Sequence, residues 1–179
     1  MPELVEQLAN GEVTAVNLTR GYLDRITRLD QSGPSLRAII SINPNAIVQA
    51  KASDARRAQG ESLGPLDGIP VVVKGNIETA DPMSTTAEAL ALKDNITGRD
   101  SPTVAGLRAN GAIILGKANL SQWANFRSNG SINGWSSVGG QVRTRTYLIA
   151  HRVALVPARV RRWRQGWRHW LSERRPTVP

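Results

Sequence analysis

The chain changes composition abruptly near Arg143, and this change limits how much of it can share one fold. Residues 144–179 carry nine arginines and a single acidic side chain. Residues 1–143 hold the remaining 14 basic and 13 acidic side chains, so nearly all of the net charge of +9 belongs to the second segment. We therefore expect residues 1–143 to form the folded part. We expect residues 144–179 to be a basic tail that is disordered or marginally helical, because any helix there would rest on local propensity alone.

Three short apolar runs within the first 143 residues predict β-strands, because they are rich in β-branched residues and bounded by Asn, Gly or Pro. They are residues 38–42, 69–73 and 112–116. Helices are predicted around these runs from capping residues and apolar periodicity. They comprise a short helix ended by Gly11, one capped by Thr14, one over residues 46–60, one that starts at Pro102 after the cap Ser101, and a short one over residues 119–126. The high content of Gly, Ser and Asn in residues 127–140 predicts a loop. Strands that alternate with helices indicate the α/β class.

Several classes of protein are excluded by what the sequence lacks. It contains no Cys, so disulfides, thiolate metal sites and cysteine nucleophiles are excluded. No apolar run approaches the roughly 20 residues that cross a bilayer. The first residues, Met1-Pro2-Glu3-Leu4, do not resemble a signal peptide. We therefore expect a cytoplasmic protein without a membrane span.

The loop and strand at residues 64–74 read G-P-L-D-G-I-P-V-V-V-K, and further distinctive blocks follow in a fixed order. These blocks are residues 76–81, 83–87, 111–121, 123–128, 134–137 and 139–141. The ordered series resembles the amidase-signature family over residues 1–143. The resemblance implies the N-terminal part of a mixed β-sheet core flanked by helices, in an amidase domain that is incomplete here.

The resemblance assigns Lys74 the role of catalytic base in a Ser-Ser-Lys triad. In that family a strand delivers a buried lysine, and desolvation lets its amine act as a base near neutral pH. A second serine bridges the lysine and the nucleophilic serine, backbone N–H groups stabilise the oxyanion, and no metal or cofactor takes part. The intact relative would hydrolyse a linear or cyclic amide C–N bond, such as a peptide amide or a short oligoamide. Without the motif, a lysine that ends a strand would be an ordinary solvated charge.

Other residues of the same blocks are candidates for the lining of the family's cleft. They are Lys117, Ser121, Thr85 and Thr86. Taken singly, each is also consistent with a structural or solvated position. The sequence departs from the family directly after the lysine, where aspartate is usual and Gly75 stands here.

The segment after Arg143 fits the family only when it is read in another frame. The family expects N-P-Y and then a Gly/Ser-rich loop, and the chain contains neither. Translating residues 144–179 one base out of frame, with synonymous codons chosen freely, gives N-P-Y at the junction, then C-G-S-S-S-G-S and finally T-E-T-D-G-S. The bridging serine would lie where Leu155, Val156 and Pro157 stand, and the nucleophile at Pro179. The sequence therefore predicts a frameshift near Arg143 and a chain without amidase activity.

Two alternatives remain open. The basic tail could be a binding module for nucleic acid or an anionic membrane, because its arginines alternate with Trp163, Trp167 and Trp170, which would share one face of a helix. However, Arg and Trp also accumulate whenever GC-rich Ala, Leu and Val codons are read one base off, so we expect no specific nucleic-acid partner. Alternatively, a separate downstream product could complement the fragment and rebuild the enzyme.

Overall fold

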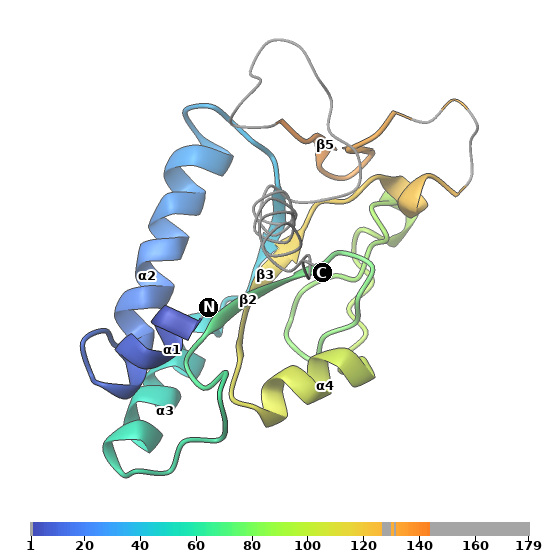
Figure 1. The fold of residues 1–179 in the computed structure, drawn as a ribbon. Helices are drawn as coiled ribbons and strands as arrows, with labels where there is room; N and C mark the ends of the chain where they lie inside the picture. The colour runs from blue at the N-terminus through green and yellow to red at the C-terminus, as the bar shows by residue number, and fades with distance from the viewer. Residues whose placement is uncertain (1, 127–129, 131, 144–179) are drawn as a thin grey trace, which may run out of the picture.

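The computed structural model describes residues 2–126, 130 and 132–143. Over this part of the chain, helices and strands alternate as the sequence predicts (Figure 1). In chain order the main elements are α1 (Pro2–Ala9), α2 (Ala15–Ile26), β1 (Ile39–Ile42), α3 (Ala46–Ala58), β2 (Pro70–Lys74), α4 (Pro102–Ala109) and β3 (Ile113–Ala118). The α/β class is therefore confirmed. The prediction of a disordered or marginally helical tail concerns residues 144–179, which lie outside the described part.

Local side-chain signals set where two of the helices begin. The Thr14 hydroxyl accepts a hydrogen bond from the Asn17 N–H at 3.1 Å and caps α2. The Ser101 hydroxyl accepts the Val104 N–H at 3.3 Å and caps α4, and Pro102 occupies the first position of that helix. Both caps were predicted from the sequence and are confirmed.

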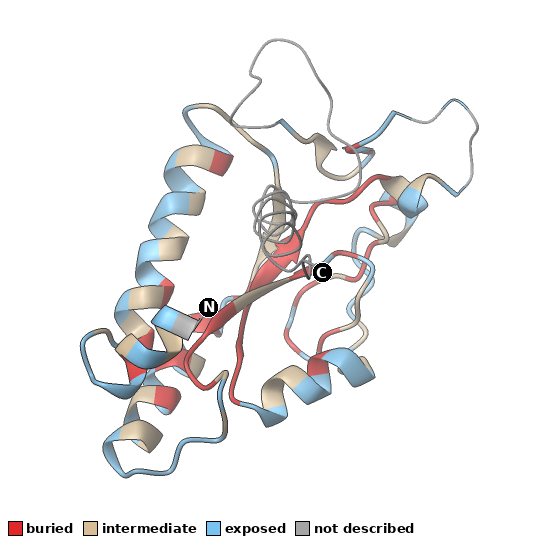
Figure 2. Cartoon of the chain, in the orientation of Figure 1, coloured by how far each residue is buried: buried red, intermediate tan, exposed pale blue. Residues whose placement is uncertain are grey.

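The strands β1, β3 and β2 form a mixed sheet in that order, with β3 at its centre. β3 is antiparallel to β1 and parallel to β2, and all its residues are buried (Figure 2). Helices α1 to α3 pack on one face of the sheet and α4 on the other (Figure 1). The core on the first face consists of Leu8, Ala15, Ala46, Ala50, Ile69, Ile113 and Leu115. The core on the second face consists of Val73, Met83, Val104 and Ile114.

A β-bulge in β3 decides which face its last residues occupy. The pairing of β3 with β2 skips Leu115, which is therefore an extra residue in the strand. After the bulge, Lys117 pairs with Val73, which belongs to the core under α4. Paired residues of neighbouring strands share a face, so Lys117 faces the α4 side and Lys74 faces the opposite side. Strict alternation from Leu115 would have turned Lys117 toward α1 to α3.

The segment after β3 differs from the sequence prediction. The helix expected over residues 119–126 is reduced to a 3-10 turn, Gln122–Asn125, in which Trp123 and Ala124 adopt the left-handed backbone region with φ of 50° and 51°. The loop expected over residues 127–140 contains a short hairpin of β4 (Trp135–Ser136) and β5 (Gly140–Gln141). The Asn119 side chain holds this hairpin, because its amide group donates to the Gly140 carbonyl at 3.3 Å and its oxygen accepts the hydroxyl of Ser136 at 2.8 Å.

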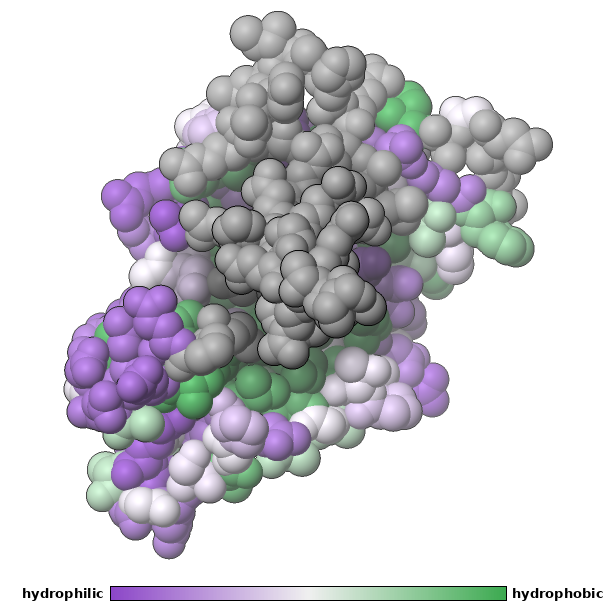
Figure 3. All heavy atoms as spheres, in the orientation of Figure 1, coloured by the Kyte–Doolittle hydropathy of each residue, from purple (hydrophilic) through white to green (hydrophobic). Residues whose placement is uncertain are grey.

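Apolar side chains remain exposed at one end of the described structure. Figure 3 shows a separate band of hydrophobic residues below the centre of this view, where Figure 1 places β2, with hydrophilic surface on either side of it. Segments 87–90, 123–126 and 132–137 are joined by hydrogen bonds, such as that of the Leu90 N–H to the Ser137 hydroxyl at 3.0 Å. These segments carry five exposed large apolar residues, which we call the apolar end: Leu90, Trp123, Phe126, Ile132 and Trp135. None of the helices in the described part is long and apolar enough to cross a bilayer.

Candidate functional site

Lys74 is the last residue of β2, where the sequence predicts it. The backbone on both sides is fixed, because the Gly75 N–H donates to the Ala118 carbonyl and the Ile77 N–H donates to the Lys74 carbonyl, each at 3.0 Å. The side chain of Lys74 is exposed, whereas the resemblance implies a buried amine. The physical reason is that β2 lies at an edge of the described sheet. The catalytic role of Lys74 stays a prediction.

A second lysine, Lys117, lies on the neighbouring strand with its side chain fully buried. Its Nζ donates a hydrogen bond to the Thr85 hydroxyl at 2.6 Å. Glu88 is also fully buried, and its Oε2 accepts a long hydrogen bond from the Thr86 hydroxyl at 3.4 Å. Its Oε1 has no hydrogen-bond partner in the described part of the chain. We call these four residues the Lys117 cluster.

Burial dominates the electrostatics of the Lys117 cluster. It lowers the pKa of Lys117 to about 8, although the negative charges of Asp81, Glu78 and Glu88 oppose this shift. Burial raises the pKa of Glu88 to about 7, against the opposing hydrogen bonds and the charge of Lys117. Both groups therefore change charge close to neutral pH, where ordinary lysine and glutamate side chains do not titrate.

The other candidate lining residues have defined structural contacts. Thr85 and Thr86 belong to the Lys117 cluster, and the Thr86 N–H donates to the Gly75 carbonyl at 2.9 Å. Ser121 is buried apart from them, and its hydroxyl accepts the Gly134 N–H at 2.7 Å. Thr85 and Thr86 thus tie the segment after β2 to the sheet, while Ser121 fastens the segment that leads into the hairpin. The structure brings Lys117, Thr85 and Thr86 together and leaves Lys74 on the other face.

An ion-pair network stabilises the irregular segment between β2 and α4. Arg108 of α4 pairs with Asp100 at 2.7 Å and also with Asp81. Asp81 in turn accepts a hydrogen bond from the Asn43 side chain at 2.9 Å. Because Asp81 also acts electrostatically on Lys117, the network supplies part of the negative charge that a buried ammonium requires.

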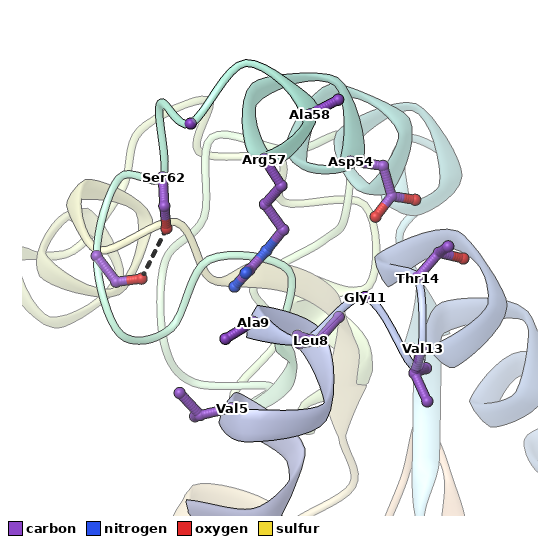
Figure 4. Close-up of a pocket in the computed structure, with 12 residues that line it drawn as sticks. Val5, Leu8, Ala9, Gly11, Val13, Thr14, Asp54, Arg57, Ala58 and Ser62 are labelled. Atoms are coloured by element: carbon purple, nitrogen blue, oxygen red, sulfur yellow. Dashed lines mark hydrogen bonds between the residues drawn. The ribbon is translucent and has the colours of Figure 1, made fainter.

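A cavity of about 510 Å³ lies between α1, α3 and the turn that follows α3 (Figure 4). Val5 and Leu8 contribute apolar walls, and Arg57 points toward them from α3 (Figure 4). The Arg57 guanidinium donates to the Asp67 carbonyl at 2.6 Å, so it supports the loop before β2. The cavity includes neither Lys74 nor any residue of the Lys117 cluster, and the predicted site therefore lies elsewhere. Across residues 2–126, 130 and 132–143, no three His, Asp or Glu side chains converge as metal ligands do.

Glu88 is the residue of the site that the sequence analysis did not identify. An acid in a loop is usually solvated, and this one has no motif of its own. A signal nevertheless exists, because Glu88 interrupts the otherwise apolar run from Ala87 to Leu92. The second signal is Gly75, which stands where the resemblance implies an aspartate. Only the structure connects the two positions.

Comparison with known proteins gives a consistent result. Residues 17–139 match the family described as Amidase. A protein of Arthroderma benhamiae assigned to the amidases is 43% identical over 138 residues, which are 77% of this chain and 23% of that protein. A protein of Arabidopsis thaliana, also assigned to the amidases, is 40% identical over 141 residues, which are 78% of this chain and 27% of that protein.

Solved structures agree with the sequence matches. The native peptide amidase of Stenotrophomonas maltophilia is similar to the described fold, with a TM-score of 0.76 and 48% sequence identity. The similarity covers 78% of this chain and 28% of the peptide amidase. The chain therefore spans about a quarter of the length of the relatives that it matches.

Proposed function

This chain belongs to the amidase family, and on that premise we propose that it is the lysine-bearing portion of a hydrolase of carboxamide or peptide-type C–N bonds. The observation that carries the proposal is the position of Lys74. It ends β2 within the matched residues 17–139 and follows the G-P-L-D-G-I-P loop that the family shares. The similarity to peptide amidase supports a substrate of small size, such as a peptide amide.

In the complete enzyme, Lys74 would act as the general base. Its neutral amine would take a proton from the bridging serine, which takes one from the nucleophilic serine as that oxygen attacks the amide carbon. Collapse of the tetrahedral intermediate would break the C–N bond, and the departing amine would receive the proton by the reverse route. A covalent acyl-enzyme would remain until water hydrolyses it.

We further propose that the 179-residue chain does not turn over amides by itself. Leu155, Val156 and Pro157 stand where the shifted frame would supply the bridging serine. A lysine base requires a desolvated amine, and Lys74 is exposed. The frameshift proposal is supported by the family match, which ends at residue 139, just before Arg143.

The test compares the 179-residue chain with the product of a gene that is repaired by one base after codon 143 and extended downstream. Ammonia release from a dipeptide amide is measured for both proteins. We expect no release from the chain, and release from the repaired protein that falls by about a thousandfold or more in Lys74→Ala. Lys93→Ala, which removes another exposed lysine, is the matched control and should leave the rate unchanged. Hydrolysis by the unrepaired chain that disappears in Lys74→Ala would contradict the proposal.

The frameshift itself is tested at the level of DNA. Resequencing codons 140 to 179 from an independent clone shows which bases are present. Codons that are incompatible with the serine loop in the shifted frame would rule out the frameshift and leave the Lys74 assignment to be judged by the rate measurements.

A further inference from the structure

The space next to Gly75 is filled by a side chain from another segment. An ideal Cβ on Gly75 would overlap Oε1 of Glu88 and would lie 2.8 Å from Cδ1 of Ile40. Residue 75 therefore cannot carry a side chain while Glu88 keeps its position. The backbone of Gly75 does not lie in the left-handed region, so packing against Glu88, and not the backbone conformation, requires glycine here.

Glu88 is held in this place by its backbone. Ala87 and Glu88 have φ of 45° and 63°, values that non-glycine residues adopt only at some cost. The N–H groups of Thr86 and Ala87 both donate to the Gly75 carbonyl, at 2.9 and 3.2 Å, and the Glu88 N–H donates to the Thr86 hydroxyl at 3.0 Å. These bonds fold the segment onto the end of β2, so the carboxylate is delivered by a fixed loop.

A buried carboxylate at this position costs free energy. Glu88 has no exposed surface and one of its oxygens lacks a hydrogen-bond partner among the described residues, an arrangement that destabilises a fold unless it is compensated. An apolar side chain of similar volume would fill the same space at lower cost. Packing alone therefore does not explain an acid at this position. Its carboxylate occupies the space next to Gly75, the residue after Lys74, where the resemblance to the amidase-signature family leads us to expect an aspartate.

We propose that Glu88 supplies, from another segment, the carboxylate that residue 75 cannot carry, and that Glu88 and Gly75 form one unit that positions the end of β2. The pairing of the two residues rests on geometry alone, while its link to catalysis through Lys74 rests on the proposed function. Glu88 is a positioning residue in this scheme, because it acts through the strand end and touches no reacting atom.

The surroundings of Glu88 define what its charge would affect. Lys117 is the charged group that acts on it from the adjacent strand. Glu78 and Asp81 act on Lys117 from the segment after β2. A carboxylate moved from residue 88 to residue 75 would stay beside the same lysine and should keep the same electrostatic role.

The experiment moves the carboxylate within the 179-residue chain and measures thermal unfolding. Gly75→Asp alone introduces a carboxylate into the space that the Glu88 carboxylate already fills, and it should lower Tm by more than about 5 °C. Glu88→Gly alone, at a position with positive φ, should lower Tm by less. The double variant Gly75→Asp/Glu88→Gly should recover about half or more of the loss caused by Gly75→Asp. Losses that simply add would overturn the proposal.

An asparagine at residue 75 distinguishes the effect of the carboxylate charge from the effect of side-chain volume. Gly75→Asn/Glu88→Gly has the shape of the double aspartate variant without its charge. Between pH 4.5 and 7 the aspartate variant should lose Tm as the wild-type chain does, whereas the asparagine variant should not. Identical pH profiles for the two would show that only volume matters and would overturn the proposal. Where Gly75→Asp fails to fold, the pair Gly75→Ala and Gly75→Ala/Glu88→Ala gives the same comparison with a smaller overlap. These measurements follow unfolding only, so their failure leaves the amidase proposal intact, and an inactive repaired enzyme leaves the pairing intact.

Discussion

At the scale of single residues, Glu88 and Lys117 of the Lys117 cluster both make the stability of this chain depend on pH. The pKa of Glu88 is raised by burial from 4.5 to about 7 and that of Lys117 is lowered by burial from 10.5 to about 8. A group whose pKa differs between the folded and unfolded states makes the free energy of unfolding change with pH between the two values. The two groups act in separate pH ranges, so their effects can be measured one at a time.

We expect the free energy of unfolding to fall as pH rises from about 4.5 to 7, because the unfolded chain releases the Glu88 proton while the folded chain retains it. We expect it to rise again from about pH 8 to 10.5, because the folded chain has released the Lys117 proton that the unfolded chain still binds. Each change is on the order of 3 kcal/mol. Urea unfolding at a series of pH values measures both.

Variants assign each part of this profile to its residue. Glu88→Gln should flatten the dependence of the unfolding free energy on pH between about pH 4.5 and 7. Lys117→Met should flatten it between about pH 8 and 10.5. Lys93→Met removes a lysine whose side chain is 61% exposed and should leave both parts unchanged. If the rise in unfolding free energy above about pH 8 persists in Lys117→Met, another group causes it.

The residues of the site were predictable to different degrees. Lys74 could be located because a specific motif surrounds it, and its place at the end of β2 follows from the strand pattern. Thr85 and Thr86 were identified as a pair, and both lie in the Lys117 cluster. Glu88 could not be identified, because its role depends on contact with Gly75, and a contact across 13 residues of irregular chain leaves no periodic signal.

At the scale of elements, two glycines at α4 should respond to substitution with opposite signs. Gly111 follows the helix with φ of 83°, and a Cβ there would lie 2.5 Å from the backbone Cα of Asp67. Gly106 lies within α4 and a Cβ there meets open space. Gly111→Ala should therefore destabilise the chain by about 2 kcal/mol or more, and Gly106→Ala should stabilise it by about 0.5–1 kcal/mol.

Chemical denaturation of the two variants at one pH checks this pair of predictions. Each glycine serves as the control for the other, because both changes add a single methyl group at one helix. If Gly111→Ala and Gly106→Ala lowered the free energy of unfolding equally, the turn after α4 would not constrain Gly111.

The elements themselves were largely predictable, and the exceptions share a cause. Strands and capped helices follow local signals, so β1, β2, β3 and α4 start or end within a few residues of their predicted bounds. The hairpin of β4 and β5 depends on Asn119, which contacts it from a distant position in the chain. The bulge at Leu115 depends on how β2 and β3 pair. Neither can be inferred from a pattern within one segment.

At the scale of the whole molecule, the apolar end should make the chain bind hydrophobic probes. Its side chains include Phe126, which is 92% exposed, and large exposed apolar side chains on neighbouring segments promote association. We expect the chain to enhance the fluorescence of an apolar dye, and to self-associate as concentration rises. Both effects should decrease in Phe126→Ser/Trp135→Ser, measured by dye titration and light scattering.

Val48→Ser provides the matched control for this prediction. Val48 on α3 is 65% exposed but is not part of the apolar end, and isolated exposed apolar residues are ordinary features of protein surfaces. Its loss should therefore leave dye binding unchanged. An equal decrease in both variants would show that the dye does not recognise the apolar end.

For the molecule as a whole, the extent of the folded part could be predicted from the sequence, but the exposure of Lys74 could not. The composition change near Arg143 indicated that the first 143 residues supply the fold, and the family match lies within them. The exposure of Lys74 could not be predicted from its motif, because burial depends on what packs beside β2, and β2 is an edge strand of the described sheet. A motif within one strand does not specify the neighbours of that strand.

The extra residue in β3 lets one strand supply side chains to both layers of the domain. Because Leu115 has no partner in β2, it packs in the core under α1 to α3, while Lys117 still pairs with Val73 and faces α4. Removing the codon for Leu115 would make the pairing of β3 with β2 continuous and would leave Lys117 opposite Val73. A single three-base deletion would thus take an apolar side chain out of one layer and keep the cation in the other.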